Sequence, residues 1–218
     1  MHPPRIAMTS QYGTTRVPSG EIVLPFSRPP PALGVASAAR STLVTTSIQS
    51  LRKHGFYDRY ARHLSNDQRD ALLTAVAGTW LPMDLAFAHY AACGALDLTL
   101  AEQTAIAMEV GDRVNGTFLG SMLRMAKTVG VSPWSALGQS AKLYERLFCG
   151  GGIAVSKKGP KDARVDLIGN PLCTIDYFRV GVRGVYEVAL QLFCQRVSTF
   201  ELTARATSHS MSIRIAWV

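Results

Sequence analysis

Apolar and polar residues alternate in three short runs in the last quarter of the chain. The runs cover residues 163–169, 197–206 and 211–218, and alternation is the period of a strand that buries one face. From Thr174 to about Cys194, apolar residues instead recur every three or four positions, which is typical of a helix with one buried stripe. This quarter of the chain therefore predicts the order strand, helix, strand, strand.

Two glycines and two arginines distinguish the predicted helix. Gly181 and Gly184 lie next to its apolar stripe. We interpret both as close-packing positions, because residues without side chains let another element approach closely. Arg179 and Arg183 are one helical turn apart near the start of the helix. They could bind the head of an anionic ligand, or they could pair with acidic residues along the helix.

The middle of the chain, residues 45–149, has the period of helices. Capping boxes at 65–68 and 99–102 and a Ser-Pro pair at 132–133 mark three helix starts. The Trp-Leu-Pro sequence at 80–82 is expected to open another helix, with proline at its first position. Glycines interrupt the long helical run that begins at 99–102, which indicates either close helix packing or a break in the helix.

The first forty residues contain seven prolines. Proline removes backbone donors and blocks regular ladders, so we predict that residues 1–44 are a largely disordered segment rich in Pro, Ser and Thr. The apolar cluster at 21–26 is an exception, because it could form an edge strand, bind another chain as a short peptide, or stay part of the tail. Residues 45–218 are predicted to form a single α+β domain, in which a helical N-terminal part packs with a small antiparallel sheet.

The net charge of +8 is concentrated near the N-terminus, where residues 1–54 carry six Lys and Arg against one acidic residue. These positive charges are spread along the segment, whereas a nucleic-acid site would need a dense patch. We therefore predict no nucleic-acid partner. The chain has no apolar run long enough for a membrane span or a secretory leader, so a cytoplasmic location is expected.

The cysteines show no spacing typical of metal binding or catalysis. There are four, none in a Cys-x-x-Cys pair, which argues against a zinc ribbon or a thioredoxin-like site. Each has apolar neighbours in the sequence, as buried thiols do. The chain also lacks the Gly-x-Ser-x-Gly sequence of a nucleophile elbow. We therefore predict no metal, no cofactor and no enzymatic activity.

Aromatic residues on several predicted helices are candidates for a ligand pocket. If they converge, they would line a mainly apolar cavity between the helices and the sheet; otherwise they pack in the core. His89 lies in the middle of a predicted helix. Its neutral imidazole could bind haem iron or another metal, or it could be a core residue satisfied by a hydrogen bond. The candidate pocket residues are Trp80, Phe87, His89, Tyr90, Trp134, Tyr144, Arg179 and Arg183.

The order of elements over residues 45–218 resembles one superfamily. It contains haem-NO-binding domains, four-vinyl-reductase domains and related subunits of vesicle-trafficking tethering complexes. Within it, the sequence is most similar to an uncharacterised paralogous family of short proteins abundant in myxobacteria. The residues that carry the resemblance are Trp80-x-Pro82, Glu109-x-Gly111, Phe118-Leu119-Gly120, Phe178-Arg179 with Gly184, and Arg214-Ile215-Ala216-Trp217.

The resemblance implies that the chain could bind haem or a metal. The sequence lacks most of the residues that its relatives use for these ligands. Haem-NO-binding domains use an axial histidine on an inner helix and a Tyr-x-Ser-x-Arg motif for the haem propionates. The corresponding helix here, within 133–149, contains no histidine, and the motif region reads Asp176-Tyr177-Phe178-Arg179. The C-terminal cysteine pairs of four-vinyl-reductase domains have no counterpart in the last two predicted strands.

Our first hypothesis is a non-enzymatic ligand-binding module with a sensory or regulatory role, which holds a small apolar ligand between helices and sheet. The alternative is a structural interaction protein that forms a homodimer or docks a partner through a helical face. A haem-binding gas sensor is the third and least supported hypothesis.

Overall fold

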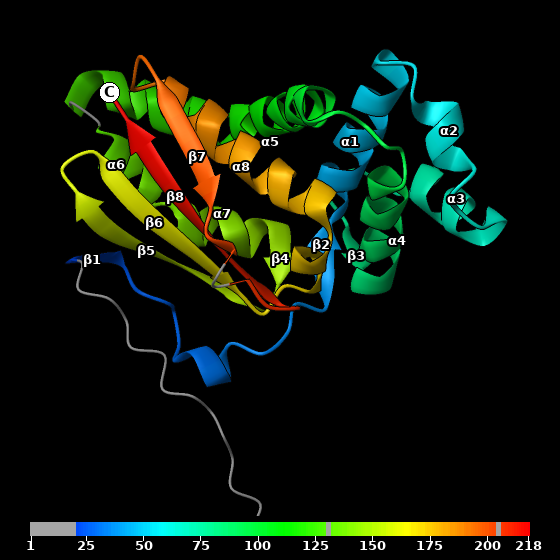
Figure 1. Ribbon diagram of the computed structural model, residues 1–218, viewed down its shortest axis with the longest axis horizontal. Coiled ribbons are helices and arrows are strands. Elements are labelled where there is room, and N and C mark those ends of the chain that lie inside the picture. Colours follow the sequence, from blue (N-terminus) through cyan, green and yellow to red (C-terminus); the bar gives the residue numbers. More distant parts are fainter. Residues whose placement is uncertain (1–20, 130–131, 204–205) are drawn as a thin grey trace, which may run out of the picture.

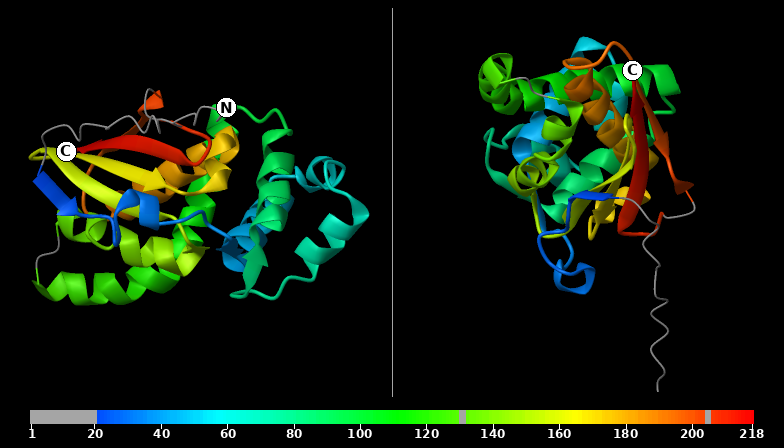
Figure 2. Two further views of the ribbon diagram at one scale, coloured as in Figure 1. Left: turned by 90° about the horizontal axis from the view of Figure 1, so that it is seen from below. Right: turned by 90° about the vertical axis from the view of Figure 1, so that its left-hand side faces the viewer.

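The computed structural model describes residues 21–129, 132–203 and 206–218, without the side chains of 115–129. The helices are α1 (Ser41–Lys53), α2 (Tyr57–Ala61), α3 (Asn66–Leu73), α4 (Met83–Gly94), α5 (Leu100–Val129), α6 (Pro133–Leu137), α7 (Ser140–Leu147) and α8 (Asp176–Gln191), with short 3-10 turns η1 (Pro30–Ala32) and η2 (Pro171–Thr174). Helices α5 to α8 lie on one face of an antiparallel sheet, and α1 to α4 gather at one end of it (Figures 1 and 2). The fold is α+β, as the hydrophobic pattern predicts.

The main sheet has five strands in the order β1-β5-β6-β8-β7, and all neighbours are antiparallel. Their bounds are β1 (Glu21–Leu24), β5 (Gly152–Gly159), β6 (Asp162–Ile168), β7 (Val197–Glu201) and β8 (Ser210–Trp217). A second sheet contains β2 (Ala38–Arg40), β3 (Trp80–Pro82) and β4 (Phe148–Cys149). The helix-covered face of the main sheet carries Val155, Val165 and Ile213, which lie opposite one another in register and are almost fully buried.

Helices α5 and α8 form the most extensive contact between two helices, and glycines allow it. A Cβ atom on Gly184 would lie 2.7 Å from the Cβ of Ala107, and one on Gly111 would lie 3.1 Å from the Cα of Val185. Side chains at these positions would push the two backbones apart. The close-packing role predicted for Gly181 is wrong, because no heavy atom lies within 4 Å of a Cβ built there.

Regular structure begins well before residue 45. Strand β1 pairs with β5 at one edge of the main sheet, and β2 lies between β3 and β4. Of the three alternatives for the apolar cluster at 21–26, the edge strand is confirmed. Residues 21–44 thus belong to the fold rather than to a disordered segment, because β1 and β2 form ladders with strands from later in the chain and α1 begins at Ser41. Residues 1–20 lie outside the described part of the chain.

Some local predictions are confirmed and others are not. The capping boxes that start at Ser65 and Thr99 are both present. The segment at 80–82 is strand β3, because Leu81 pairs with Ala39 in the small sheet, and the expected helix begins directly after it, at Met83 with Pro82 as the N-cap. Helix α5 runs through its glycines without a break. Within the described ranges, no helix combines the length and the apolar character that a membrane span requires.

We expect Gly184→Ala to destabilise the fold by about 1–3 kcal/mol, the range typical of overpacked interiors, because the new methyl group would lie 2.7 Å from the Cβ of Ala107. Gly181→Ala on the same helix is the matched control. Its methyl group would meet no atom within 4 Å, and alanine is favoured over glycine in helices by up to about 1 kcal/mol. Denaturant unfolding of both variants measures the difference. Equal effects of the two substitutions would contradict the close contact between α5 and α8.

Candidate ligand-binding cavity

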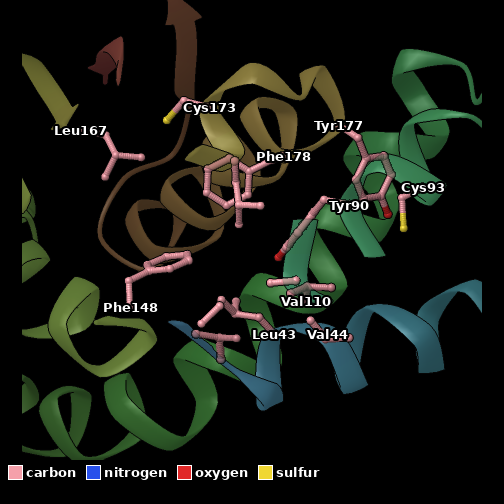
Figure 3. Close-up of a cluster of buried hydrophobic side chains, with 14 of the residues drawn as sticks. Leu43, Val44, Tyr90, Cys93, Val110, Phe148, Leu167, Cys173, Tyr177 and Phe178 are labelled. Carbon is pink, nitrogen blue, oxygen red and sulfur yellow. The ribbon is translucent and has the colours of Figure 1, made fainter. Parts of the chain in front are cut away.

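A cavity of about 90 Å³ lies between α8, α5, α7 and the inner face of the main sheet. Its wall is mainly apolar and includes Leu43 of α1, Val110 of α5, Leu143 of α7, Leu167 of β6 and Phe178 of α8. Several of these side chains converge in Figure 3, although they come from segments far apart in the sequence. A mainly apolar concave site with a few polar groups is typical of small-molecule binding.

Two of the predicted aromatic residues, Tyr90 and Tyr144, line this cavity. The ring of Tyr90 packs edge-on against Phe178, with 5.2 Å between the ring centroids. The hydroxyl of Tyr144 accepts a hydrogen bond of 3.4 Å from the side-chain amide of Asn170. Gly181 also lines the cavity, so its missing side chain leaves room for the cavity instead of for a neighbouring helix.

The other three predicted aromatic residues lie away from the described wall. Trp80 is exposed, and the guanidinium carbon of Arg40 lies 4.0 Å from its ring centroid. Phe87 is exposed on α4. Trp134 packs edge-on against Trp217, with 4.8 Å between the centroids. The helical period predicted the segments to which these residues belong. It did not determine whether each side chain faces the cavity.

Arg179 and Arg183 do not line the cavity either, because their guanidinium groups are paired with neighbouring elements. Arg179 forms ion pairs with Asp176 and, at 3.2 Å, with Glu201 of β7. Arg183 donates to Oγ1 of Thr199 at 3.2 Å and to its backbone oxygen at 3.1 Å. Both arginines therefore fasten α8, and the geometry does not favour the alternative of an anionic ligand head.

His89 is a core residue outside the described cavity wall, with no exposed surface. Its Nδ1 atom lies 2.8 Å from the Tyr60 hydroxyl, and its Nε2 atom lies 3.7 Å from Sγ of Cys93. Burial lowers the pKa of His89 to about 3, so the ring is neutral near pH 7. Of the two alternatives for His89, the satisfied core histidine is the one observed, because both ring nitrogens have partners.

The described part of the wall contains no metal ligands and no catalytic pair. Its residues include no His, Cys, Asp or Glu, and the described residues as a whole contain no cluster of three or more such side chains that could hold a metal ion. Burial raises the pKa of Tyr186 to about 12 and also raises that of Tyr90 and Tyr144, so these phenols stay protonated. The arrangement suits binding better than acid–base or nucleophilic chemistry.

Five polar wall residues are not among the candidates that the sequence pattern indicates: Ser47 of α1, Gln103 of α5, Ser140 of α7, and Tyr177 and Tyr186 of α8. Ser47 follows Leu43 by one helical turn on the buried face of α1. A serine within an apolar stripe was the signal that could have indicated a polar position in a pocket. Gln103 and Tyr177 lie near helix starts, where polar residues are common, so the pattern gave no comparable signal for them.

No protein-family model matches the chain, and no curated protein sequence matches it. Solved H-NOX structures resemble it in fold. The Fe(II) unliganded H-NOX protein from K. algicida superposes with a TM-score of 0.58 at 9% identity, over 82% of this chain and 96% of that chain. An oxygen-binding H-NOX domain related to soluble guanylate cyclases superposes with a TM-score of 0.53 at 11% identity, over 82% of this chain and 94% of that chain. The chain therefore shares the H-NOX fold.

We expect His89 to make stability depend on pH. Its pKa falls from an ordinary 6.5 to about 3 on folding, so between these values the unfolded chain binds more protons. The stability that neutral His89 contributes is fully present above pH 6.5 and is lost as the pH falls toward 3, by up to about 1.4 kcal/mol per pH unit. Urea unfolding from about pH 7 to about pH 5 avoids most carboxylate titration. His89→Gln should have a shallower slope there than the unsubstituted protein, and equal slopes would contradict a neutral buried His89.

Proposed function

We propose that the chain is a non-enzymatic ligand-binding module with a sensory or regulatory role, and that a small, mainly apolar ligand occupies the cavity. The observation that carries this proposal is the cavity itself, which lies between helices and sheet and has no charged residue in the described part of its wall. Apolar pockets of this kind bind small molecules through burial of their surface.

Haem does not fit the residues of this cavity. Solved neighbours include a protein in which porphyrin distortion modulates the haem redox potential, and haem iron takes an axial His, Cys, Met or Tyr ligand. The described wall includes none of the first three, and burial raises the pKa of its phenols, which keeps them protonated. It also includes no Arg or Lys to pair with propionates. We infer that this chain uses the H-NOX fold for a different ligand.

The position of the cavity supports a regulatory role. A ligand there would contact α1 at Leu43 and α8 at Phe178, and so would join the helices at one end of the molecule to the helix that packs on the sheet. Binding to the folded state alone adds about 2.7 kcal/mol of stability when the ligand is at a hundred times its Kd. One solved neighbour is described in terms of H-NOX activation, which also supports this role. Docking of a protein partner through a helical face stays a prediction.

Cyclopentane is a direct probe of the cavity, because dry apolar cavities bind small hydrocarbons. We expect its addition to shift amide resonances of wall residues and to raise the melting temperature. Gly181→Leu should abolish both responses, because Gly181 lines the cavity and no heavy atom lies within 4 Å of its Cβ position. The leucine side chain would therefore fill the space that the hydrocarbon needs.

Gly181→Ala is the matched control, because it changes the same position but adds a single carbon atom. It should keep a measurable, weaker response. A Gly181→Leu variant that responds to cyclopentane as strongly as the unsubstituted protein would show that the hydrocarbon binds elsewhere.

A further inference from the structure

We propose that the ligand of this cavity has a neutral polar head on a small apolar body, and that the hydroxyl groups of Ser47 and Tyr177 hold that head. This inference rests on the proposed function and narrows it to a chemical class of ligand, exemplified by small alcohols and carboxamides.

The first observation is a set of buried polar atoms without hydrogen-bond partners. The Ser47 Oγ, Tyr177 OH and Gln103 Oε1 atoms are buried, and none of them makes a hydrogen bond of acceptable geometry. All three residues line the same cavity. Ser47 is 2% exposed and Tyr177 is 7% exposed. Folded proteins satisfy almost all buried polar groups with protein, water or ligand atoms, so a rotation of these side chains toward the cavity would let a ligand there supply the partner.

Neighbouring side chains do not remove this deficit. The Tyr177 hydroxyl contacts the Ser47 hydroxyl and the Cys93 thiol at the limit of hydrogen bonding: burial and the thiol raise the pKa of Tyr177, and Ser47 opposes the rise. A thiol is only a weak donor and acceptor, and the Cys93 sulfur already faces Nε2 of His89 at 3.7 Å. The two hydroxyl groups therefore form a polar corner in a mainly apolar wall.

Gln103 adds an acceptor of known orientation. Its Nε2 atom donates to the backbone oxygen of Leu98 at 2.8 Å. A carbonyl oxygen can only accept, so the amide nitrogen must face Leu98 and the amide oxygen must be the atom left without a partner. Gln103 thus offers one acceptor, and Ser47 and Tyr177 offer two hydroxyl groups that can both donate and accept.

The surroundings favour a neutral head over a charged one. No charged side chain is among the described wall residues, and a charge without a counter-charge is strongly disfavoured in an apolar site. The two arginines of α8, Arg179 and Arg183, are paired with Glu201 and Thr199. The cavity volume of about 90 Å³ holds roughly six water-sized groups, which matches a five-membered ring with one polar substituent.

The test compares cyclopentanol with cyclopentane on the purified protein and on Tyr177→Phe, with binding measured by NMR titration. We expect Tyr177→Phe to weaken cyclopentanol binding about threefold to tenfold, the effect of one hydrogen bond, and to leave cyclopentane binding unchanged. For each ligand, the affinity for the variant is compared with the affinity for the unsubstituted protein. The hydration of the free ligand is the same in both measurements and therefore cancels. Ser47→Ala should show the same selective loss.

Tyr144→Phe is the control, because Tyr144 lines the same cavity and its hydroxyl already accepts a hydrogen bond from Asn170. This substitution should change the affinities for cyclopentanol and for cyclopentane by the same factor. Cyclopentylammonium and cyclopentanecarboxylate should bind at least about a hundredfold more weakly than cyclopentanol, because their charges would be buried without a partner.

If Tyr177→Phe affects both ligands equally or neither, or if a charged analogue binds as well as cyclopentanol, the polar-head inference is wrong. The proposed function would survive that result as long as cyclopentane still binds to the protein and fails to bind to Gly181→Leu. If neither cyclopentane nor cyclopentanol binds, both the inference and the proposed function fail.

Discussion

The close contact between the backbones of α5 and α8 is the constraint on which the rest of the structure depends. It exists because Gly184 presents no side chain to Ala107, and because Gly111 presents none to Val185. The arginines of α8 fasten its opposite side to β7 through Glu201 and Thr199. Helix α8 is thus held between α5 and the sheet, and its distance from both is fixed. A space left beside a helix fixed in this way cannot close by a small shift of that helix.

Gly181 and Gly184 show how far sequence reasoning reaches into the site. Both lie on α8 near its apolar stripe, and the sequence predicts the same role for both. In the structure, Gly184 meets Ala107 while Gly181 borders the cavity. The difference depends on the rotation of α8 about its own axis, which is set by contacts with α5 and β7. Those contacts join residues far apart in the chain, so no local pattern encodes them.

The same reason explains the mixed outcome for the aromatic residues. The hydrophobic period predicted the α+β fold and the C-terminal order of elements, because each element buries one face and that requirement is local. Phe87 and Tyr90 share α4, yet Tyr90 is 6% exposed and lines the cavity whereas Phe87 is 39% exposed. The period shows that α4 has a buried side, but tertiary packing determines which residues border an empty space on that side. The shared H-NOX fold likewise fixes the framework without fixing the chemistry of the cavity wall.

Strand β1 has a consequence for the way the chain reaches its final form. It covers one edge of the main sheet by pairing with β5, although most of the helical part of the sequence separates the two strands. During synthesis β1 therefore emerges long before its ladder partner and must wait, unpaired, for it. An unpaired strand can recruit a strand of another chain. The first residues of the described fold can thus be paired only after β5 has been made, by which point α1 to α7 have already been synthesised.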